Sequence, residues 1–447
     1  MRPLNAEPIK EQVFLDDYHR KEMVNYGFEI APTPIRFGRD FTSDIGHEVD
    51  KLHIKNPVII TDENVVKTRA MQEVTQSLLP KAHISYDIFD KATTEPTDKS
   101  LKYAIEFARN KKYDCFIAVG GDSVMDTARI VALFASNPQM DLDDLLKHPH
   151  GRYVNSENPV YPLISIPTTF SLASESDGGL TFKIADKNTM CTICNEAVKP
   201  SLIIADPLNV LSVPKNIAAY GALDLFIHAL EAFTLKAYMP HISNMPFVTG
   251  ADLQSIFRIT NSISDIWATE TLEIMHKYLR RAVQEPEDVE ARSQLLMAAT
   301  FSGMGFRNPA IRLCHTLSYP IRALGKYEKD NPKVPHGLAV AVMAPVAFMF
   351  SAYADPTRHL EASRILGQDL AYNSSPQKIG HGLADILRNY LRLFKIPNGL
   401  SELGFKFEDL AKLAELGVEN FRTSPSSSKE MDQEILREMY EFAWKIY

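Results

Sequence analysis

Two side chains on one predicted helix have the right types and spacing to bind a metal ion. Asp224 and His228 stand four residues apart in Gly221–Phe233, a segment that predicts a helix. Residues i and i+4 share a helical face, so a carboxylate and an imidazole there can reach one ion. His315 and His336 add two imidazoles. This donor set suits Fe(II) or Zn(II) better than Mg(II) or Ca(II), and the bound ion could act as a Lewis acid on an alcohol or carbonyl.

A glycine-rich turn in the first half of the chain is a candidate phosphate site. Val119–Ala128 follows an apolar strand pattern and opens a helical one. Glycines allow backbone N–H groups to approach a phosphate, and a helix N-terminus favours an anion. The pattern is not G-x-G-x-x-G, and strand–turn–helix junctions often contain glycine. The cofactor-binding candidates in this turn are Gly120, Gly121, Asp122, Ser123 and Asp126.

Asp62 follows another predicted strand, and two roles are open for it. Dinucleotide-binding folds commonly place an acid at such a strand end, where it hydrogen-bonds the adenosine ribose and favours NAD over NADP. A lone aspartate in a turn is more often a local cap.

The elements that must position these groups fall into two halves. Apolar strand patterns alternate with helical patterns at 100–111 and 123–134, which predicts a mostly parallel sheet covered by helices. The strand patterns are 57–61, 84–89, 115–119, 162–166 and 202–205. Long helical patterns follow at 215–233, 263–282, 289–302, 338–353 and 379–394. We therefore predict an α/β, dinucleotide-binding-like domain over residues 1–210 and an all-α, metal-binding domain over 211–447.

Composition and charge narrow the choice of partners. The 447 residues are 45% hydrophobic and 23% charged, with a formal net charge of −8, which disfavours a nucleic-acid partner. Met1–Arg20 contains several acids and no apolar run, so no secretory or transit signal is recognisable. Gly337–Ala354 lacks charge, but it is short for a membrane span and contains Pro345, so we expect a buried helix. These features predict a cytoplasmic protein with no membrane partner.

The cysteines do not indicate a disulfide framework, since the chain has only four. Cys191 and Cys194 form a C-x-x-C, which could be a redox pair or half of a zinc site. The sequence has no second C-x-x-C, and Thr189–Cys194 predicts a short strand. We interpret this pair as structural.

Taken together, these segments resemble the iron-containing, group III alcohol dehydrogenases over residues 30 to 445. Within that family the chain is most similar to the hydroxyacid–oxoacid transhydrogenases, through Ser262–Ala268, Lys277–Ala282 and Leu313–Pro320. The resemblance implies an N-terminal NAD(P)-binding domain, a C-terminal helical domain and a homo-oligomer, such as a dimer. It also implies a divalent metal, iron or zinc, held by Asp224, His228, His315 and His336.

The nucleotide-binding motifs depart from the family pattern. The usual Gly-Gly-Gly-Ser turn has Asp122 at its third position. A carboxylate about 5 Å from a pyrophosphate charge, at an effective dielectric near 20, costs about 3 kcal/mol. The usual Pro-Thr-Thr-x-Gly-Thr-Gly-Ser-Glu signature keeps Thr168 and Thr169 but loses both glycines, and a lysine common on the next hairpin is Met190. NAD(P) binding is therefore possible but in doubt.

Three residues are catalytic candidates on the substrate side. Arg307 and Arg312 could clamp a carboxylate or phosphate in a bidentate manner, or they could form surface or structural ion pairs. Tyr319 stands where many relatives carry a second histidine, four residues after the third ligand, for proton relay. A phenol with an ordinary pKa near 10 is a poor base at neutral pH but a usable donor.

Two functions follow from these residues. The first is a metal-dependent oxidoreductase that transfers hydride between NAD(P) and a small alcohol, aldehyde or hydroxy acid. The alternative is a non-redox, metal-dependent hydrolase, lyase or isomerase, or a paralogue that has kept the metal site and lost NAD(P) binding.

Overall fold

The computed structural model describes residues 32–81, 83–145, 158–170, 179–187, 189–235, 262–305, 313–325, 334–423 and 432–447. Contacts between residues divide the chain into two compact units. The sheet unit comprises Pro32–Leu225 and Tyr278–Met304, and the helical unit contains Phe226–Lys277 and Gly305–Tyr447. The division after residue 210 that we expected from the sequence stays a prediction.

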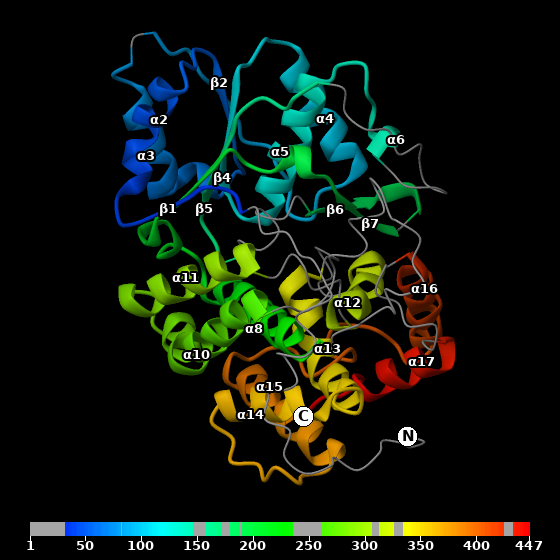
Figure 1. Cartoon of the computed structure of the whole chain (residues 1–447). Coiled ribbons are helices and arrows are strands. Elements are labelled where there is room, and N and C mark those ends of the chain that lie inside the picture. The colour runs from blue at the N-terminus through cyan, green and yellow to red at the C-terminus, as the bar shows by residue number, and fades with distance from the viewer. Residues whose placement is uncertain are drawn as a thin grey trace, which may run out of the picture. The chain divides into compact units, whose positions relative to one another are not determined.

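A six-stranded parallel sheet forms the centre of the sheet unit (Figure 1). Its order is β1-β8-β5-β4-β2-β3, and every pairing is parallel. Each strand except β1 overlaps a predicted apolar segment, so the predicted α/β fold class is confirmed. The strands are β1 (Ile35–Phe37), β2 (Pro57–Ile60), β3 (Asp87–Phe89), β4 (Cys115–Gly120), β5 (Leu163–Pro167) and β8 (Leu202–Ala205).

Both faces of this sheet are covered by helices, so the strands β2, β4, β5 and β8 are buried at every position. Successive strand residues point to opposite faces, so one strand can serve two cores. Val58 and Ile60 pack with α4 (Asp98–Arg109) and α5 (Asp122–Ser136). Ile59 packs in a second core that includes residues of α2 and α3. The other elements here are α2 (Ile45–Lys51), α3 (Arg69–Leu78), α6 (Leu142–Leu145), and the short 3-10 helices η1 (Phe41–Asp44), η2 (Val65–Lys67), η3 (Ala185–Lys187), η4 (Glu196–Val198) and η5 (Pro207–Val210).

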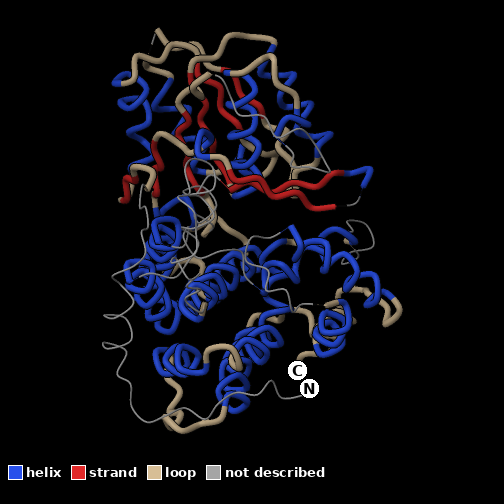
Figure 2. The backbone as a smooth tube through the Cα atoms, turned by 45° about the vertical axis from the view of Figure 1, so that its right-hand side comes forward, coloured by secondary structure: helices blue, strands red, loops and turns tan. Residues whose placement is uncertain are grey.

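A separate antiparallel hairpin, β6 (Gly179–Ile184) with β7 (Thr189–Cys194), lies beside the sheet (Figure 2). Its side chains Leu180, Phe182 and Ile193 join the core formed with α4 and α5. The C-x-x-C segment lies in β7, so the predicted strand at 189–194 is confirmed.

The helical unit packs around α13 (His336–Ser351), in which every residue from Gly337 to Phe348 is buried. This confirms the buried helix expected within 337–354. Helix α13 packs against α12, α15 and α17. The long helices of the chain are α8 (Lys215–Thr234), α10 (Ser262–Gln284), α11 (Val289–Gly305), α12 (Leu313–Leu324), α13, α14 (Pro356–Ile365), α15 (Pro376–Leu393), α16 (Asp409–Thr423) and α17 (Gln433–Phe442).

Local capping explains where several helices begin. Thr97 and Ser100 form a reciprocal capping box at the start of α4. Ser375 caps α15, and Pro376 stands at its first position, where a missing N–H costs no hydrogen bond. Among the described helices, α8 alone is long and apolar enough to cross a membrane by length and composition. Since 72% of its apolar window is buried and core helices pass the same test, this is weak support for a span.

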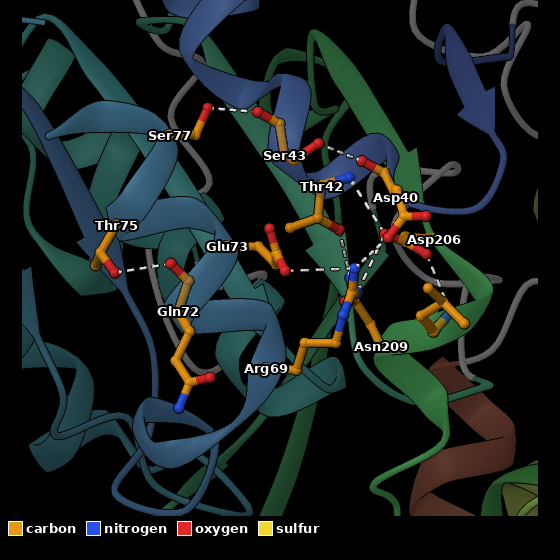
Figure 3. Close-up of polar contacts among 11 residues, drawn as sticks. Asp40, Thr42, Ser43, Arg69, Gln72, Glu73, Thr75, Ser77, Asp206 and Asn209 are labelled. Atoms are coloured by element: carbon orange, nitrogen blue, oxygen red, sulfur yellow. Dashed lines mark hydrogen bonds and ion pairs between the residues drawn. The ribbon is translucent and has the colours of Figure 1, made fainter. Parts of the chain in front are cut away.

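A buried carboxylate fastens the loops that follow β1 and β8 (Figure 3). Asp206 is fully buried, and its Oδ1 accepts a hydrogen bond from Leu208 N at 3.0 Å. Its Oδ2 accepts from Thr42 N at 3.3 Å and lies 3.5 Å from Arg69 Nη1. The same arginine pairs with Asp40, 2.6 Å away, at the surface. Asp206 therefore links η1, η5 and α3 at one edge of the sheet.

We predict that Asp206→Ala lowers the free energy of unfolding by about 2–4 kcal/mol, because it leaves buried N–H groups without an acceptor. Asp40→Asn is the matched control, since it removes the exposed partner of Arg69 and should cost less than about 1 kcal/mol. Asparagine also tolerates the positive φ of 63° at this position. Urea denaturation measures both variants, and equal losses would contradict the central role of Asp206.

Candidate functional site

From Ala222 to Thr234, helix α8 is buried at every residue except Asp224 and His228. Asp224 and His228 are half-buried, whereas Leu223, Phe226 and Ile227 beside them are fully buried. The spacing of four residues places both polar groups on the same face, as predicted. The apolar faces of α8 thus fix the helix and leave the two side chains directed away from the core.

The remaining predicted ligands stand at the beginnings of two other helices. His315 is in the first turn of α12, and His336 is the first residue of α13. Ligand-capable atoms of Asp224, His315 and His336 all lie within 4.8 Å of one another. The ring centroids of His228 and His315 are 5.1 Å apart. The structure therefore clusters Asp224, His315 and His336 and places the His228 ring beside His315, and one carboxylate with three imidazoles is a donor set that suits a divalent iron or zinc ion.

One neighbour of the candidate metal site was not foreseen from the sequence. Glu231 Oε2 lies 2.6 Å from His315 Nδ1, and Oε1 accepts a hydrogen bond from Cys314 N, also at 2.6 Å. An ionised carboxylate can only accept, so a neutral His315 ring in this contact carries its proton on Nδ1 and keeps the lone pair on Nε2. The available signal was position, since Glu231 follows His228 by three residues in a helix with few charges.

Arg322 is a second neighbour that was not foreseen from the sequence, and its contact with His336 favours the opposite ring tautomer. Arg322 Nη1 lies 3.2 Å from His336 Nδ1, and the arginine is buried. A guanidinium can only donate, so a neutral His336 ring in this arrangement has its proton on Nε2. Metal ligation through Nε2 therefore requires that this proton leave and that the contact with Arg322 change.

Of the three catalytic candidates, only Tyr319 lies within the described residues. Tyr319 lies on α12 four residues after His315, so the two share a helical face, and it is partly exposed. Arg307 and Arg312 lie outside the described residues. The roles of all three stay predictions.

The cofactor candidates gather at the carboxyl edge of the parallel sheet. The chain leaves β2 toward β3 on one side and leaves β4 toward β5 on the other, so the connections reverse between β2 and β4. Open parallel sheets bind ligands at such a switch point. Thr168 N donates to Gly120 O at 2.9 Å. A Cβ on Gly121 would come within 3.1 Å of the Thr169 methyl group. Gly120, Gly121, Thr168 and Thr169 are thus neighbours.

Asp62 also lies at this edge, directly after Thr61, whose hydroxyl donates to Val119 O at 2.9 Å. Its Oδ1 accepts hydrogen bonds from Asn64 N at 2.8 Å and Val65 N at 2.9 Å. This is the capping role that the sequence left open. Its role toward a ribose stays a prediction.

Two more candidates have structural partners. Ser123 Oγ accepts from Glu95 N at 3.3 Å. Asp126 is buried, forms an ion pair with Arg129, and accepts from Thr181 N of β6 at 3.1 Å. These contacts hold the hairpin and the loop before α4 against α5, and the role of both residues toward a nucleotide stays a prediction.

Asp122 is the first residue of α5, and Gly121 is the N-cap residue. The positive end of the helix dipole stabilises a carboxylate at this position. The same end of the helix would bind a phosphate, so the carboxylate competes with it. Across the hairpin, Met190 pairs with Lys183, and directly opposed residues share a face of the hairpin. A lysine is thus available next to the position where the family pattern has one.

Comparison with known proteins extends over most of the chain. Residues 32–207 match the family model described as iron-containing alcohol dehydrogenase, and residues 256–444 match that of the Fe-containing alcohol dehydrogenase family, C-terminal. The mitochondrial hydroxyacid-oxoacid transhydrogenase of Caenorhabditis elegans is 39% identical over 429 residues, covering 95% of this chain and 91% of that protein. Its Xenopus tropicalis namesake is 36% identical over 428 residues, covering 94% and 91%. In fold, the chain is similar to 1,3-propanediol oxidoreductase, with a TM-score of 0.78 at 22% identity, over 93% of this chain and 100% of that one.

The expected cytoplasmic location is wrong, because both of these relatives are named mitochondrial. The expectation rested on finding no recognisable signal in Met1–Arg20. Compartment is set by targeting segments that receptors read and that are often removed, and neither the fold nor the net charge reports on them.

We predict that Asp122→Gly tightens NADH binding by about two orders of magnitude, since one repulsive charge pair of about 3 kcal/mol is removed. Asp122→Asn is the matched control, because it removes the charge and keeps the size of the side chain. Isothermal titration of NADH into metal-loaded protein measures both. If neither variant binds more tightly than the natural chain, the Asp122 carboxylate does not face the phosphates.

We also predict that Arg322→Met tightens divalent metal binding by about tenfold, because it removes a positive charge and a donor beside His336. Competition with a chelator of known zinc affinity measures the effect. Arg322→Lys keeps the charge and should show a smaller gain. Unchanged or weaker binding in Arg322→Met would show that the guanidinium does not oppose the ion.

Proposed function

Because the chain belongs to the iron-containing alcohol dehydrogenase family, a family of metal-dependent oxidoreductases, we propose that it transfers hydride from a hydroxy acid to an oxo acid through one nicotinamide cofactor. The observation that carries this proposal is the convergence of Asp224, His315 and His336 within 4.8 Å. The relatives named hydroxyacid-oxoacid transhydrogenase, which align along 94–95% of the chain, supply the substrate class.

In this proposal Asp224, His228, His315 and His336 hold the metal ion. Iron follows the family description, and zinc is the alternative that the same donor set accepts. The bound ion supplies Lewis acidity toward a hydroxyl or carbonyl oxygen. Tyr319, on the same face of α12 as His315, holds or donates the proton of that oxygen through its hydroxyl group.

The cofactor would lie along the carboxyl edge of β2, β4 and β5. The turn at Gly120 and Gly121 is tight, because a Cβ would meet Val124 at the first position and Thr169 at the second, and Thr168 and Thr169 line the adjacent strand end. A nicotinamide retained at this edge would supply hydride exchange with two successive substrates, so the same residues would serve both half-reactions. In this proposal Asp122 weakens the hold on the cofactor, and Lys183, which lies opposite Met190 on the hairpin, supplies a charge that offsets it.

Two further properties are part of the proposal. A mitochondrial location follows the names of the relatives. A homodimer follows the family resemblance, and light scattering on the purified chain would test it.

A second function is favoured by the surroundings of four candidate cofactor residues. Asp122 stands in the phosphate turn, and the side chains of Asp62, Ser123 and Asp126 have structural partners. A chain with an intact metal site and a weakened nucleotide site could be a non-redox, metal-dependent hydrolase, lyase or isomerase, or a paralogue that does not bind NAD(P).

The test is a transfer assay with a hydroxy acid deuterated at the carbinol carbon and an unlabelled oxo acid. The protein is loaded anaerobically with iron, or with zinc, and assayed with and without added NAD. Deuterium in the newly formed hydroxy acid, detected by mass spectrometry, is the expected result. No transfer at millimolar NAD by protein of full metal content would contradict the redox function and favour the second one.

We predict that His228→Ala abolishes both metal retention and transfer, because it removes a nitrogen ligand that α8 holds in place. Metal content is measured by mass spectrometry after dialysis. His381→Ala, which removes an exposed histidine on α15, is the matched control and should retain both. Normal metal content in His228→Ala would show that this residue is not a ligand.

A further inference from the structure

We propose that Glu231 is a positioning residue of the metal site: its carboxylate sets the tautomer of the His315 ring and ties that histidine to α8. The inference rests on the metal site of the proposed function. It assigns Glu231 no contact with the ion, the substrate or the cofactor.

Both carboxylate oxygens of Glu231 form hydrogen bonds. Oε2 lies 2.6 Å from His315 Nδ1, and Oε1 accepts from Cys314 N at 2.6 Å. The glutamate side chain is 5% exposed and that of His315 is 13% exposed. Hydrogen bonds to an ionised group are stronger than neutral ones, and exclusion of water strengthens them further.

The contact at Nδ1 determines which nitrogen of His315 can bind a metal. A neutral imidazole carries one proton, and the carboxylate holds that proton at Nδ1. The lone pair is then at Nε2, the state that a metal ligand requires. His336 is in the opposite situation, because Arg322 donates to its Nδ1. His315 is thus the histidine of this pair whose protonation already suits an ion.

The contact at Cys314 N fixes the backbone of the same ligand. The first N–H groups of a helix lack intrahelical acceptors, and Cys314 N is one of them in α12. A carboxylate at this end of the helix is also favoured by the helix dipole. Glu231 therefore fixes the ring and the backbone of His315 relative to α8, the helix that carries Asp224 and His228.

Glu231→Gln tests this role with almost no change in size. The amide oxygen can still accept from Cys314 N, but the NH2 group then donates to His315 Nδ1. The ring proton moves to Nε2, which can no longer ligate. In the reversed orientation of the amide, two donors face each other at Cys314. We expect metal affinity to fall by about 10- to 100-fold, the range found when such partners of ligands are removed.

The readouts are titration with Co²⁺ and the visible absorption of the bound ion, which reports on its coordination and does not depend on activity. Glu231→Asp keeps the charge but shortens the reach, so it should restore part of the affinity. Asp265→Asn is the matched control, because Asp265 pairs with Arg358 in the same unit. It should lower the melting temperature and leave Co²⁺ affinity and absorption unchanged.

Weaker Co²⁺ binding with altered absorption in Glu231→Gln, and neither in Asp265→Asn, would support the positioning role. Wild-type affinity and absorption in Glu231→Gln would overturn it, as would an equal loss of affinity in Asp265→Asn. If the natural chain itself binds no Co²⁺, the metal site and the positioning role both fail. If it binds Co²⁺ in a Glu231-dependent way but transfers no deuterium, only the proposed reaction fails.

Discussion

The cost of removing polar groups from water is the constraint on which helix α8 and the candidate metal site depend. Helix α8 is apolar on most of its surface, yet Asp224, His228 and Glu231 lie within three turns of one another. A buried or half-buried carboxylate is tolerable only when charges or donors surround it. The first turn of α12 supplies such partners for Glu231, namely the N–H of Cys314 and the ring of His315. The requirement that a buried carboxylate be partnered therefore brings a candidate metal ligand to α8.

In the sheet unit, the burial of the central strands determines where polar side chains can lie. Its central strands serve two apolar cores, so polar chemistry is confined to the strand ends. Asp62, Gly120, Thr168 and Asp206 each stand at the carboxyl end of a strand or within two residues of it. Some of these groups have become structural. Asp206 holds loops together, and Asp62 caps a turn. The carboxyl edge of the sheet therefore contains candidate binding residues together with residues, such as Asp206, that hold its loops in place.

The sequence predicted what local patterns encode. Apolar runs located β2, β4, β5 and β8, whereas β1 was missed because its three residues are half-buried and form no apolar run. The spacing of Asp224 and His228 indicated a shared helical face. Contacts made across the fold were beyond reach, because no pattern within α8 or α12 shows that Glu231 meets Cys314, or that Arg322 meets His336. Asp126 is the reverse case, since a motif position proposed it and Thr181, 55 residues away, accounts for its carboxylate.

The guanidinium of Arg322 has a consequence for the balance of charge around the candidate metal site. Asp224 and Glu231 contribute two negative charges, and Arg322 contributes a positive one beside His336. When a divalent ion is added to these described side chains, the cations outweigh the anions. The net positive charge of such a site repels cationic molecules and attracts anions. It adds little electrostatic binding energy for a neutral alcohol. A hydroxy acid brings its own carboxylate to complete the neutralisation, which a simple alcohol cannot do.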